Sequence, residues 1–459
     1  IDRLNPEHAA ADIYHWTPSV QDFTDPVQEK TYMLGMLADI NTRNPLVLET
    51  FKQTYSWWIE EVGVDAFRID TVMLADFPFW HHFLNDPDGI HARAHALGKT
   101  DFLTFGESFS ISAPFETSGE EKIVSYIGSE SMPGVKSMLA FPLYATLSRV
   151  FAEGKPTAEL KQRVEAFMEA FPDPHRTPTF IDNHDTRRFL GIGSGDGFEQ
   201  ALTTLFTLPG IPVLLQGTEQ GLRKTRQTLF AGGYGTDQDL FDTGSRWYRT
   251  IARLARLRRD NPVFTRGSVS VLAADPTGAG MFAYRRSYGD EQALVLINTA
   301  PHSIWVPGID TGIKDSLTLT TLYRKGFPHD LATDPDGRLS AELPGHSIVV
   351  ATTRGAERMS RSDKTNRPAT IEITTRLENR VLSEDQLISG TLSQPGASLR
   401  LLIDGDLDSA IPFKADDQGQ WTVLLPVRDF GEADHHLQVY APELRISSPR
   451  IPYRSAVTR

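Results

Sequence analysis

Three carboxylates stand at the ends of short apolar runs that are typical of buried strands. They are Asp70 in "FRID", Glu107 in "FGES" and Asp185 in "IDNHD". The carboxyl ends of the strands of a parallel α/β barrel meet on one face, so we expect the three side chains to share a pocket. Like charges at close range raise the pKa of at least one carboxyl group. One protonated and one ionised carboxyl is the pair that cleavage of a glycosidic bond requires.

Arg68 lies two residues before Asp70, so both side chains share one face of the expected strand. On that face the guanidinium would keep Asp70 ionised. One alternative is a structural pair, because buried charges persist only when they are paired. Another is a metal site, in which the carboxylates and His184 would bind a divalent ion. A single histidine accompanies the three acids, which favours acid and base chemistry.

Short strands must carry these residues, and the sequence between 45 and 266 offers them. Apolar and β-branched runs predict strands at five segments: 64–70, 102–108, 135–143, 178–184 and 211–217. Helical periodicity predicts helices at 45–62 and 244–260. Strands separated by helices pair in parallel, which predicts an α/β barrel or an open sheet.

The remainder of the chain has the pattern of β structure. From 267 to 355 short strands alternate with Gly, Pro and Asp turns, which indicates a small antiparallel β-domain. The polar stretch at 356–368 predicts a linker. Residues 369–459 then predict a second antiparallel domain, an immunoglobulin-like β-sandwich.

The composition excludes several classes of protein. With 459 residues, no cysteine and a formal net charge of −13, the chain has no thiolate ligands for zinc and no disulfide framework. Its excess of acidic residues argues against a nucleic-acid partner, which would favour a basic surface. It contains no apolar run long enough to cross a membrane, so we expect no membrane partner.

As a set, the segments "GVDAFRID", "FGES" and "FIDNHD" resemble the signature segments of the α-amylase family, glycoside hydrolase family 13. The segment "LADIN" at 37–41 resembles a further signature, in domain B of that family. The resemblance spans roughly residues 12 to 355 and implies an α/β fold with a TIM (β/α)8 barrel, followed by β-sandwich domains. It also implies retaining cleavage of α-glucans.

The resemblance implies a role for each motif residue. Asp70 resembles the nucleophile, and Glu107 resembles the acid that protonates the leaving oxygen and then activates water. Asp185 resembles the third carboxylate, which holds sugar hydroxyls, while Arg68 and His184 match the supporting arginine and histidine. Retention predicts that the carboxyl groups of Asp70 and Glu107 lie about 5 to 5.5 Å apart.

Compared with that family, the chain supplies strands four to eight of the barrel. Residues 1–44 resemble the end of domain B, residues 45–266 the C-terminal part of the catalytic barrel, and residues 267–355 the amylase-type C-terminal β-domain. Five strands cannot close an eight-stranded barrel without leaving an open edge. We therefore expect either a separate N-terminal polypeptide, produced by a nick in a long domain B loop, or a partial sequence.

Three further positions refine the expected activity. Met73 and Leu74 stand where many members of the family carry Lys-His, so we expect the sugar contacts on the leaving side to differ. Asp39, within "LADIN", resembles a position that helps to bind a structural Ca2+, an ion that prefers oxygen ligands. The alternative for Asp39 is a turn-capping aspartate. The residues of the segment "LADIN" also resemble those of family members that act on α-1,4-glucans, which favours an α-1,4-glucan substrate.

Aromatic residues are the remaining candidates for sugar contacts. A group near the N-terminus would either stack on sugar rings or pack domain B onto the barrel: Tyr14, His15, Trp16 and Phe23. Trp57 and Trp58 lie within a helical pattern, which predicts core packing. Trp421 is the single tryptophan of the last domain, which favours a structural sandwich over a starch-binding module.

The sequence thus favours a retaining α-glucan hydrolase that cleaves α-1,4 bonds in maltooligosaccharides, starch or cyclodextrins. The first alternative is an α-glucanotransferase of the same family, which passes the glycosyl unit to a sugar instead of water. The second is a non-catalytic, amylase-like interaction protein, against which the complete set of motif residues argues. By analogy with enzymes that act on extended glucans, we expect a secreted or periplasmic protein.

Overall fold

The computed structural model describes residues 11–358, 369–430 and 432–456. The chain divides into two compact units, each made of several chain segments. The first unit contains residues up to Ala145 together with Glu165–Phe180 and Gly210–Val213, and the second contains Thr146–Val164, Ile181–Pro209 and the chain from Leu214 onward. The expected linker at 356–368 lies mostly outside the described residues.

The first unit is built on short parallel strands, one within each of the five segments where the sequence predicts a strand. One sheet has the order β1-β2-β3, and a separate pair joins β4 to β5. The strands are β1 (Ala66–Ile69), β2 (Leu103–Gly106), β3 (Ser137–Met138), β4 (Pro178–Thr179) and β5 (Ile211–Pro212). Ile69 stands opposite Gly106 in the register of β1 and β2. The two strands therefore end side by side, which positions the residues that follow them.

The strand predicted at 135–143 is wrong beyond Met138. Strand β3 has two residues, and helix α6 (Phe141–Glu153) begins inside the segment. Pro142 lies in the first turn of that helix, where the N–H that proline lacks has no helical partner in any case. Phe141 packs edge-on against Phe180 with ring centroids 5.0 Å apart. A short apolar run does not by itself distinguish a strand from a buried helix.

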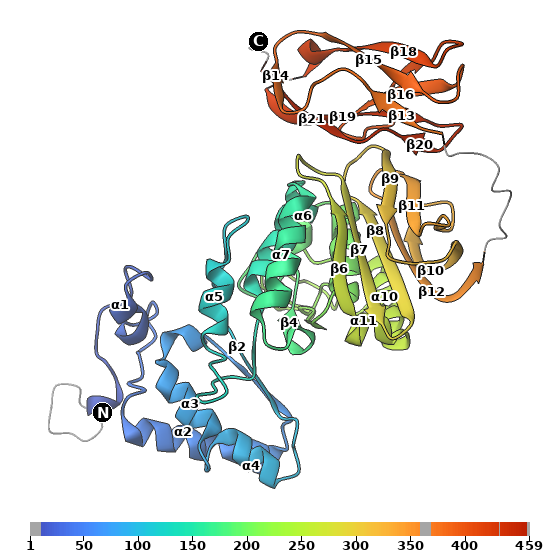
Figure 1. Cartoon of the computed structure of the whole chain (residues 1–459). Helices are drawn as coiled ribbons and strands as arrows, with labels where there is room; N and C mark the ends of the chain where they lie inside the picture. Colours follow the sequence, from blue (N-terminus) through green and yellow to red (C-terminus); the bar gives the residue numbers. More distant parts are fainter. Residues whose placement is uncertain (1–10, 359–368, 431, 457–459) are drawn as a thin grey trace. The chain divides into compact units, whose positions relative to one another are not determined.

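Helices of the first unit begin at recognisable signals. Asn44 caps α2 (Pro45–Trp57), because its side chain accepts the N–H of Leu46 at 2.9 Å and Pro45 opens the first turn. The other helices and turns are η1 (Ala11–Ile13), α1 (Pro26–Thr31), η2 (Trp58–Val62), η3 (Val72–Leu74), α3 (Phe77–Asn85), α4 (Ile90–Ala96), α5 (Ser118–Val124) and η4 (Pro174–Arg176). Helices α2, α3 and α4 contact one another (Figure 1). The helix predicted over 45–62 is confirmed, with its last turn in the π form.

The packing predicted for Trp57 and Trp58 is wrong. The two side chains are 51% and 44% exposed and meet each other edge-on, with ring centroids 5.2 Å apart. The helix buries Val47 and Ile59 instead. Helical periodicity alone thus did not identify which residues of this helix face the core, and its winding changes from α to π at Trp58.

The second unit begins with helices that precede its β-domains. Ser194 caps α9 (Gly195–Thr207) by accepting the N–H of Gly197 at 3.0 Å. The predicted helix over 244–260 is confirmed as α10 (Arg246–Asp260), which buries Leu254 and Leu257. The other helices are α8 (Phe189–Ile192) and α11 (Pro262–Arg266), while α6 and α7 (Thr157–Ala170) run from one unit into the other.

An antiparallel β-domain follows α11, as the sequence predicts. Its main sheet has the order β10-β12-β8-β7-β6, and β11 pairs with β9. The strands are β6 (Ser268–Ala274), β7 (Met281–Tyr288), β8 (Glu291–Asn298), β9 (Ile304–Asp310), β10 (Leu317–Lys325), β11 (Arg338–Leu343) and β12 (Ile348–Arg358). Apolar side chains such as Leu294, Leu296 and Val349 fill the core of this domain.

The last domain consists of two sheets, β13-β15-β18 and β14-β21-β19-β16-β17, with β20 paired to β19 (Figure 1, red end of the colour bar). Its elements are β13 (Ile371–Ile373), β14 (Arg380–Leu382), β15 (Gln386–Leu392), β16 (Ser398–Ile403), β17 (Ile411–Lys414), β18 (Gln420–Leu425), η5 (Val427–Asp429), β19 (Ala433–Ala441), β20 (Ile446–Ser447) and β21 (Ile451–Ser455). The pairs are antiparallel except β14 with β21. Trp421 is buried in the core, so its ring is not a surface platform for sugars.

The two β-domains of the second unit share a small apolar contact. Trp305 stacks on Tyr440 with ring centroids 4.2 Å apart, and Leu407 packs beside them. The Tyr440 hydroxyl donates to Glu342 at 2.7 Å, and the N–H of Leu407 donates to the carbonyl of Ser303 at 2.8 Å. Polar bonds at the rim of an apolar stack fix the orientation of the sandwich on the preceding domain.

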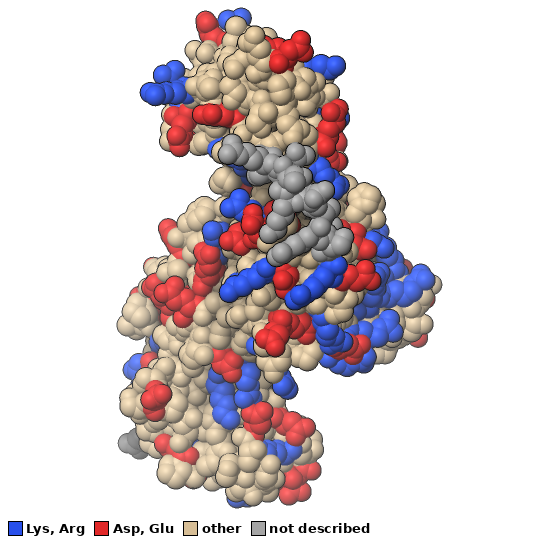
Figure 2. Space-filling view, turned by 45° about the vertical axis from the view of Figure 1, so that its right-hand side comes forward, with Lys and Arg blue, Asp and Glu red and all other residues tan. Residues whose placement is uncertain are grey.

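Charged side chains cover the surface unevenly. Figure 2 shows Lys and Arg gathered on one flank, whereas Asp and Glu are spread over the visible face. Arg249, Arg253 and Arg256 lie on the exposed side of α10, opposite its buried leucines. Within the described ranges, no helix is both long and apolar enough to cross a membrane.

Candidate active site

Arg68 joins the two carboxylates that follow β1 and β2. Its Nη1 lies 3.1 Å from Asp70 Oδ1, and its Nη2 donates to Glu107 Oε2 at 2.7 Å. The Glu107 side chain is 6% exposed, whereas that of Asp70 is 65% exposed. The structure therefore confirms that these three side chains meet, with one carboxyl group buried and the other open to solvent.

The backbone around this pair is tightly tied. The N–H of Glu107 donates to the carbonyl of Ile69 at 2.9 Å, and the N–H of Val72 donates to the carbonyl of Glu107 at 2.9 Å. Thr71 has φ of 45°, a left-handed conformation that is rare for a β-branched residue. A Cβ at Gly106 would lie 2.4 Å from a methyl carbon of Val72, so "FGES" needs glycine for close approach. The position of both carboxylates is thus set by the main chain.

A second cluster forms around Asp185 in the second unit. His184 Nε2 lies 3.0 Å from Asp185 Oδ2, and the guanidinium of Arg226 forms an ion pair with Oδ1 of the same carboxylate. Arg226 Nε also donates to the carbonyl of His184 at 3.0 Å. Arg226 stands in the long loop after β5 with φ of 59°. The sequence did not single it out, because an isolated loop arginine belongs to no motif.

Local bonds hold the "IDNHD" segment in a turn. Asn183 Oδ1 accepts the N–H of Asp185 at 2.9 Å, and Thr186 Oγ1 accepts the N–H of Asn183 at 2.9 Å. Asp182 is buried and accepts the N–H of Phe189 at 2.9 Å. Burial raises the pKa of Asp182. These side-chain to backbone hydrogen bonds hold the turn in one conformation and thereby orient Asp185.

The structure therefore assembles the sequence-predicted residues in two groups. Asp70, Glu107 and Arg68 meet in the first unit, and His184 meets Asp185 in the second. The joining of all three carboxylates in one pocket stays a prediction, as does the separation of the two reacting carboxyl groups.

Asp39 is the residue for which the family resemblance implies calcium. Its Oδ2 lies 2.5 Å from His15 Nδ1, and burial raises the pKa of its carboxyl group. The described residues do not include Asp39 in a group of three donors that could hold a metal ion. A Ca2+ ion takes six to eight oxygen ligands, so a carboxylate bonded to a histidine does not by itself fit that ion. The calcium role stays a prediction.

Met73 and Leu74 follow Asp70 in the chain and lie in turn η3. The Met73 sulfur lies 3.5 Å from Ser108 Oγ. Lys30, which the sequence analysis did not identify, donates from its ammonium to the carbonyl of Met73 and, at 3.3 Å, to that of Ala75. Burial lowers the pKa of Lys30. Lys30 thereby links helix α1 to turn η3, which follows Asp70.

The N-terminal aromatics differ in their surroundings. Tyr14 and Trp16 pack together with ring centroids 5.2 Å apart. Trp16 and Phe23 are each nearly half exposed, whereas His15 is bonded to Asp39. The sugar-stacking role of these rings stays a prediction.

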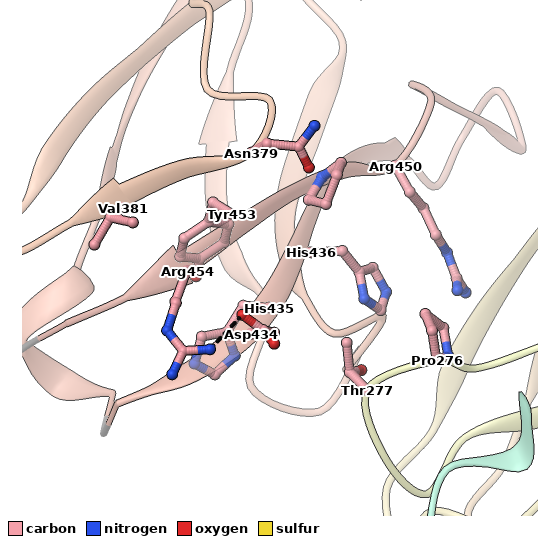
Figure 3. A pocket seen from close by; sticks show the side chains of 11 residues that line it. Pro276, Thr277, Asn379, Val381, Asp434, His435, His436, Arg450, Tyr453 and Arg454 are labelled. Atoms are coloured by element: carbon pink, nitrogen blue, oxygen red, sulfur yellow. Dashed lines mark hydrogen bonds and ion pairs between the residues drawn. The ribbon is translucent and has the colours of Figure 1, made fainter. Parts of the chain in front are cut away.

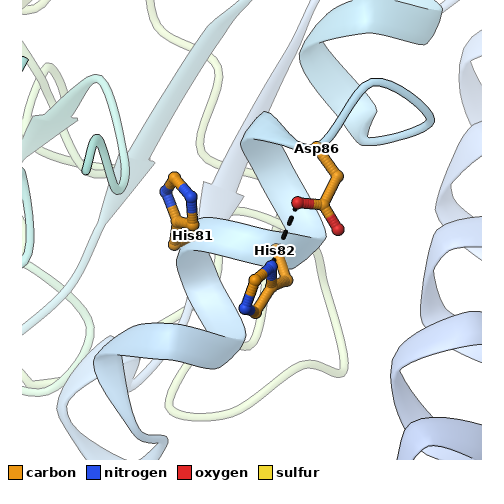
Figure 4. A group of neighbouring side chains, drawn as sticks. All are labelled: His81, His82 and Asp86. Atoms are coloured by element: carbon orange, nitrogen blue, oxygen red, sulfur yellow. Dashed lines mark hydrogen bonds and ion pairs between the residues drawn. The ribbon is translucent and has the colours of Figure 1, made fainter. Parts of the chain in front are cut away.

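Helix α3 carries the one group of three side chains in the described ranges that could hold a metal ion: His81, His82 and Asp86. Figure 4 shows His82 facing Asp86, with His81 on another side of the helix. His82 Nδ1 lies 3.0 Å from Asp86 Oδ1, and His81 Nδ1 donates to the carbonyl of Pro133 at 2.8 Å. Lys52 Nζ donates to Asp86 Oδ2 at 2.9 Å. An ammonium on the carboxylate opposes a cation, so this group serves as a helix-end ion pair.

Comparison with known proteins agrees with the motif analysis. The family described as "Alpha amylase, catalytic domain" matches residues 27–261. An α-amylase of Streptomyces lividans is 27% identical over 365 residues, which cover 70% of this chain and 37% of that protein. A cyclomaltodextrin glucanotransferase of Thermoanaerobacterium thermosulfurigenes is 28% identical over 322 residues, which cover 69% of this chain and 39% of that protein.

A solved structure shares the fold. The α-amylase of Geobacillus thermoleovorans in complex with acarbose has a TM-score of 0.61 and 22% identity, over 77% of this chain and 74% of that one. The chain spans less than half the length of the two curated relatives above. The family match at residues 27–261 covers just over half of the 459 residues, and the chain belongs to the α-amylase family.

Proposed function

We propose that this chain carries the bond-breaking groups of a retaining α-glucan hydrolase that cleaves α-1,4-glucosidic bonds in maltooligosaccharides, starch or cyclodextrins. The observation that carries the proposal is the bridge of Arg68 between Asp70 and Glu107 at the ends of adjacent parallel strands. The relatives named α-amylase and cyclomaltodextrin glucanotransferase, and the acarbose bound to the related structure, support an α-glucan substrate.

The proposed reaction has two steps. In the first, Glu107 donates its proton to the leaving glycosidic oxygen while the Asp70 carboxylate bonds to the anomeric carbon and the bond to oxygen breaks. In the second, ionised Glu107 takes a proton from water, whose oxygen bonds to the anomeric carbon and releases Asp70. The exposed Asp70 is open to a sugar, while the buried Glu107 is shielded from bulk water. Arg68 offsets the negative charge that moves between the two carboxyl groups.

Asp185 and His184 bind sugar hydroxyls in the proposed enzyme. The ring nitrogen of His184 lies next to the carboxylate oxygens of Asp185. Two neighbouring hydroxyls of a sugar can form hydrogen bonds to such a pair, one to each residue. Hydrogen bonds to hydroxyls that strengthen in the transition state lower the barrier of glycoside cleavage.

Glycosyl transfer is the second candidate function. The same carboxylates transfer the glycosyl unit when a sugar hydroxyl replaces water in the second step. The glucanotransferase relative favours it, and Met73 and Leu74, the third and fourth residues after Asp70, are apolar. Apolar side chains where the leaving sugar binds would limit the access of water to the glycosyl group bonded to Asp70.

We also propose that further barrel strands, on a separate N-terminal polypeptide or in a longer form of this sequence, pack against the first unit. Among the described strands β1 pairs with β2 alone, so its other edge carries unpaired backbone groups. Exposed apolar side chains on the adjoining helix, such as Leu46, Trp57 and Trp58, support the same proposal, because such side chains favour burial.

A product analysis tests the proposed function. The purified protein, together with any N-terminal partner, is incubated with maltoheptaose and with a cyclodextrin beside an Asp70→Asn variant. Short products that first appear as the α-anomer by early-time NMR, and that are missing with the variant, are expected. Products longer than the substrate would shift the assignment to transfer. No turnover of either sugar would contradict both enzymes and favour the interaction protein.

A further inference from the structure

A cavity of about 640 Å3 lies within the second unit. One wall is the edge of the C-terminal sandwich formed by β14, β21 and β19, and the other is the turn between β6 and β7. Figure 3 shows Pro276 and Thr277 of that turn facing the sandwich strands. Cavities of a few hundred Å3 that combine apolar walls with a few polar groups are typical ligand sites.

The register of two strands decides which side chains reach the cavity. β19 and β21 are antiparallel, with His436 opposite Pro452 on one face of the sheet. The neighbouring Tyr453 packs in the sandwich core on the other face. His436 and Arg450 extend toward the turn that carries Pro276 (Figure 3). The cavity wall therefore presents an imidazole and a guanidinium side by side with apolar surface.

The imidazole of His436 is almost fully buried, at 5% exposure, and its two nitrogens differ. Nδ1 lies 3.3 Å from Asp404 Oδ1, while Nε2 is buried without a hydrogen-bond partner in the described part of the chain. Burial lowers the pKa of His436, and the charge of Arg450 acts in the same direction. A neutral imidazole with its proton on Nδ1 leaves Nε2 as an acceptor. His436 Nε2 can therefore accept a hydrogen bond from a ligand.

Arg450 supplies a hydrogen-bond donor. Its Nε is buried and lacks a hydrogen-bond partner among the described residues, while its Nη1 lies 3.6 Å from Asp275 Oδ2. A buried polar atom without a partner destabilises the fold, so native structures rarely keep one without a reason. The wall thus offers an acceptor on His436 and a donor on Arg450, and two further lining groups, His435 Nε2 and the Tyr453 hydroxyl, also lack a partner among the described residues.

Groups of both charges lie around the cavity, and Asp404 contacts both His435 and His436. Arg450 faces Asp275, and Arg454 pairs with Asp434 at 3.1 Å. An additional anion would meet these carboxylates, and an additional cation would meet the guanidinium groups. Val381 and Pro452 add apolar surface to the same wall. A neutral ligand that is rich in hydroxyls and has an apolar face matches this combination best.

We propose that this cavity is a carbohydrate-binding site that takes a neutral sugar unit. One hydroxyl donates to His436 Nε2, its neighbour accepts from Arg450 Nε, and the ring face rests on Val381 and Pro452. The choice of an α-glucan as the sugar rests on the proposed function. The site uses the sandwich and the β6–β7 turn together, so it gives the last domain a role in holding glucan.

Titration of the full chain with maltose tests the proposal. The Asp70→Asn variant, labelled with 15N in histidine, is titrated with maltose and separately with inorganic phosphate, and the imidazole signals of His436 are identified by a His436→Gln variant. We expect a saturable shift of the His436 Nε2 signal with maltose and none with phosphate. A response to phosphate without a response to maltose would overturn the proposal.

A pair of matched variants excludes binding elsewhere. Val381 and Leu387 are 64% and 66% exposed on strands of the same domain, but only Val381 lines the cavity. Val381→Arg fills the cavity and should weaken maltose binding by about tenfold or more, whereas Leu387→Arg should leave the affinity unchanged. Equal affinities of the two variants would refute the site. Turnover of maltoheptaose is measured in parallel, so loss of the proposed function and loss of this site are seen separately.

Discussion

Each unit holds an arginine that bonds a carboxylate of the amylase motifs, but the two arginines are supported differently. Arg68 belongs to β1, which is paired with β2, and its guanidinium contacts both Asp70 and Glu107. Arg226 belongs to a loop, its side chain is 65% exposed, and it contacts Asp185 and a neighbouring carbonyl. One ion pair is thus anchored by a sheet and the other by a loop at the surface.

The two ion pairs differ in how much breaking them would cost. Glu107 is nearly buried, so separating it from Arg68 would leave an unpaired charge in a poorly solvated place. The pair of Arg226 and Asp185 faces solvent, where ion pairs contribute about 0–1 kcal/mol. The contacts of Arg68 are therefore expected to persist more firmly than the solvent-exposed pair of Arg226 and Asp185.

The largest expected effect follows substitution of Asp70, the proposed nucleophile. Asp70→Asn should lower kcat on maltoheptaose by roughly 10⁴-fold, the scale found when a covalent catalyst loses a key group. The side chain is 65% exposed, so the midpoint of thermal unfolding should hardly change. Steady-state kinetics and thermal unfolding check both statements. A variant with a tenth of the original kcat would show that Asp70 is not the nucleophile.

Arg68→Lys should have the next largest effect. Lysine keeps the positive charge but cannot contact two carboxylates with a planar fork. We expect kcat to fall by about 10²-fold, because the reacting groups are no longer held in line. Arg43→Lys is the matched control, since Arg43 pairs with Asp76 at 2.5 Å but is 63% exposed. Similar kinetics for the two variants would contradict the special role of the strand-borne arginine.

Arg226→Ala should have a smaller effect on the same reaction. We expect kcat/KM to change by less than about tenfold, because the exposed ion pair contributes little. Most of the change should appear in KM, since the residue contacts a sugar-binding carboxylate. The difference from the parent protein should shrink in high salt, which screens exposed charges. A loss as large as that of Arg68→Lys would remove the distinction between the two arginines.

The smallest expected effect is on the pH dependence of stability, through His91, which contacts the strand β2 that precedes Glu107. His91 lies between Asn85 and Thr104 of β2, with both ring nitrogens at 2.9 Å from their partners. Burial, with the charge of Lys136, lowers the pKa of His91 from 6.5 to about 4. A lowered histidine pKa stabilises the fold above pH 6.5, and this contribution is lost as the pH falls from 6.5 toward 4.

His91→Gln isolates that contribution, because glutamine offers a donor and an acceptor but does not titrate in this range. The unfolding midpoint of the variant should fall less than that of the parent protein between pH 7 and pH 5. Activity at pH 7 should stay within about twofold, since the residue does not touch the reacting groups. Parallel pH profiles of the two midpoints would show that His91 is not buried in its neutral form.

Local patterns explain which parts of the fold could be predicted. The strand segments and the helix over 246–260 follow from apolar spacing within a few residues, and each was found in the structure. The errors arose where spacing was ambiguous. The apolar run at 135–143 changes from strand to helix at Phe141, and helical periodicity at 45–62 did not identify which residues face the core. Both outcomes depend on packing partners far along the chain.

The sequence by itself determined the family and predicted Arg68 beside Asp70, with Glu107 at the end of a neighbouring strand, whereas the contact of Arg68 with Glu107 appears only in the structure. Residues two apart share a strand face, and adjacent parallel strands end together, so a short pattern was enough. Only the tertiary structure decided that Arg226 bonds Asp185, which lies 41 residues away, and that His436 faces the turn containing Thr277. Such contacts depend on the path of loops and on sheet register, and these are set by packing of the whole chain.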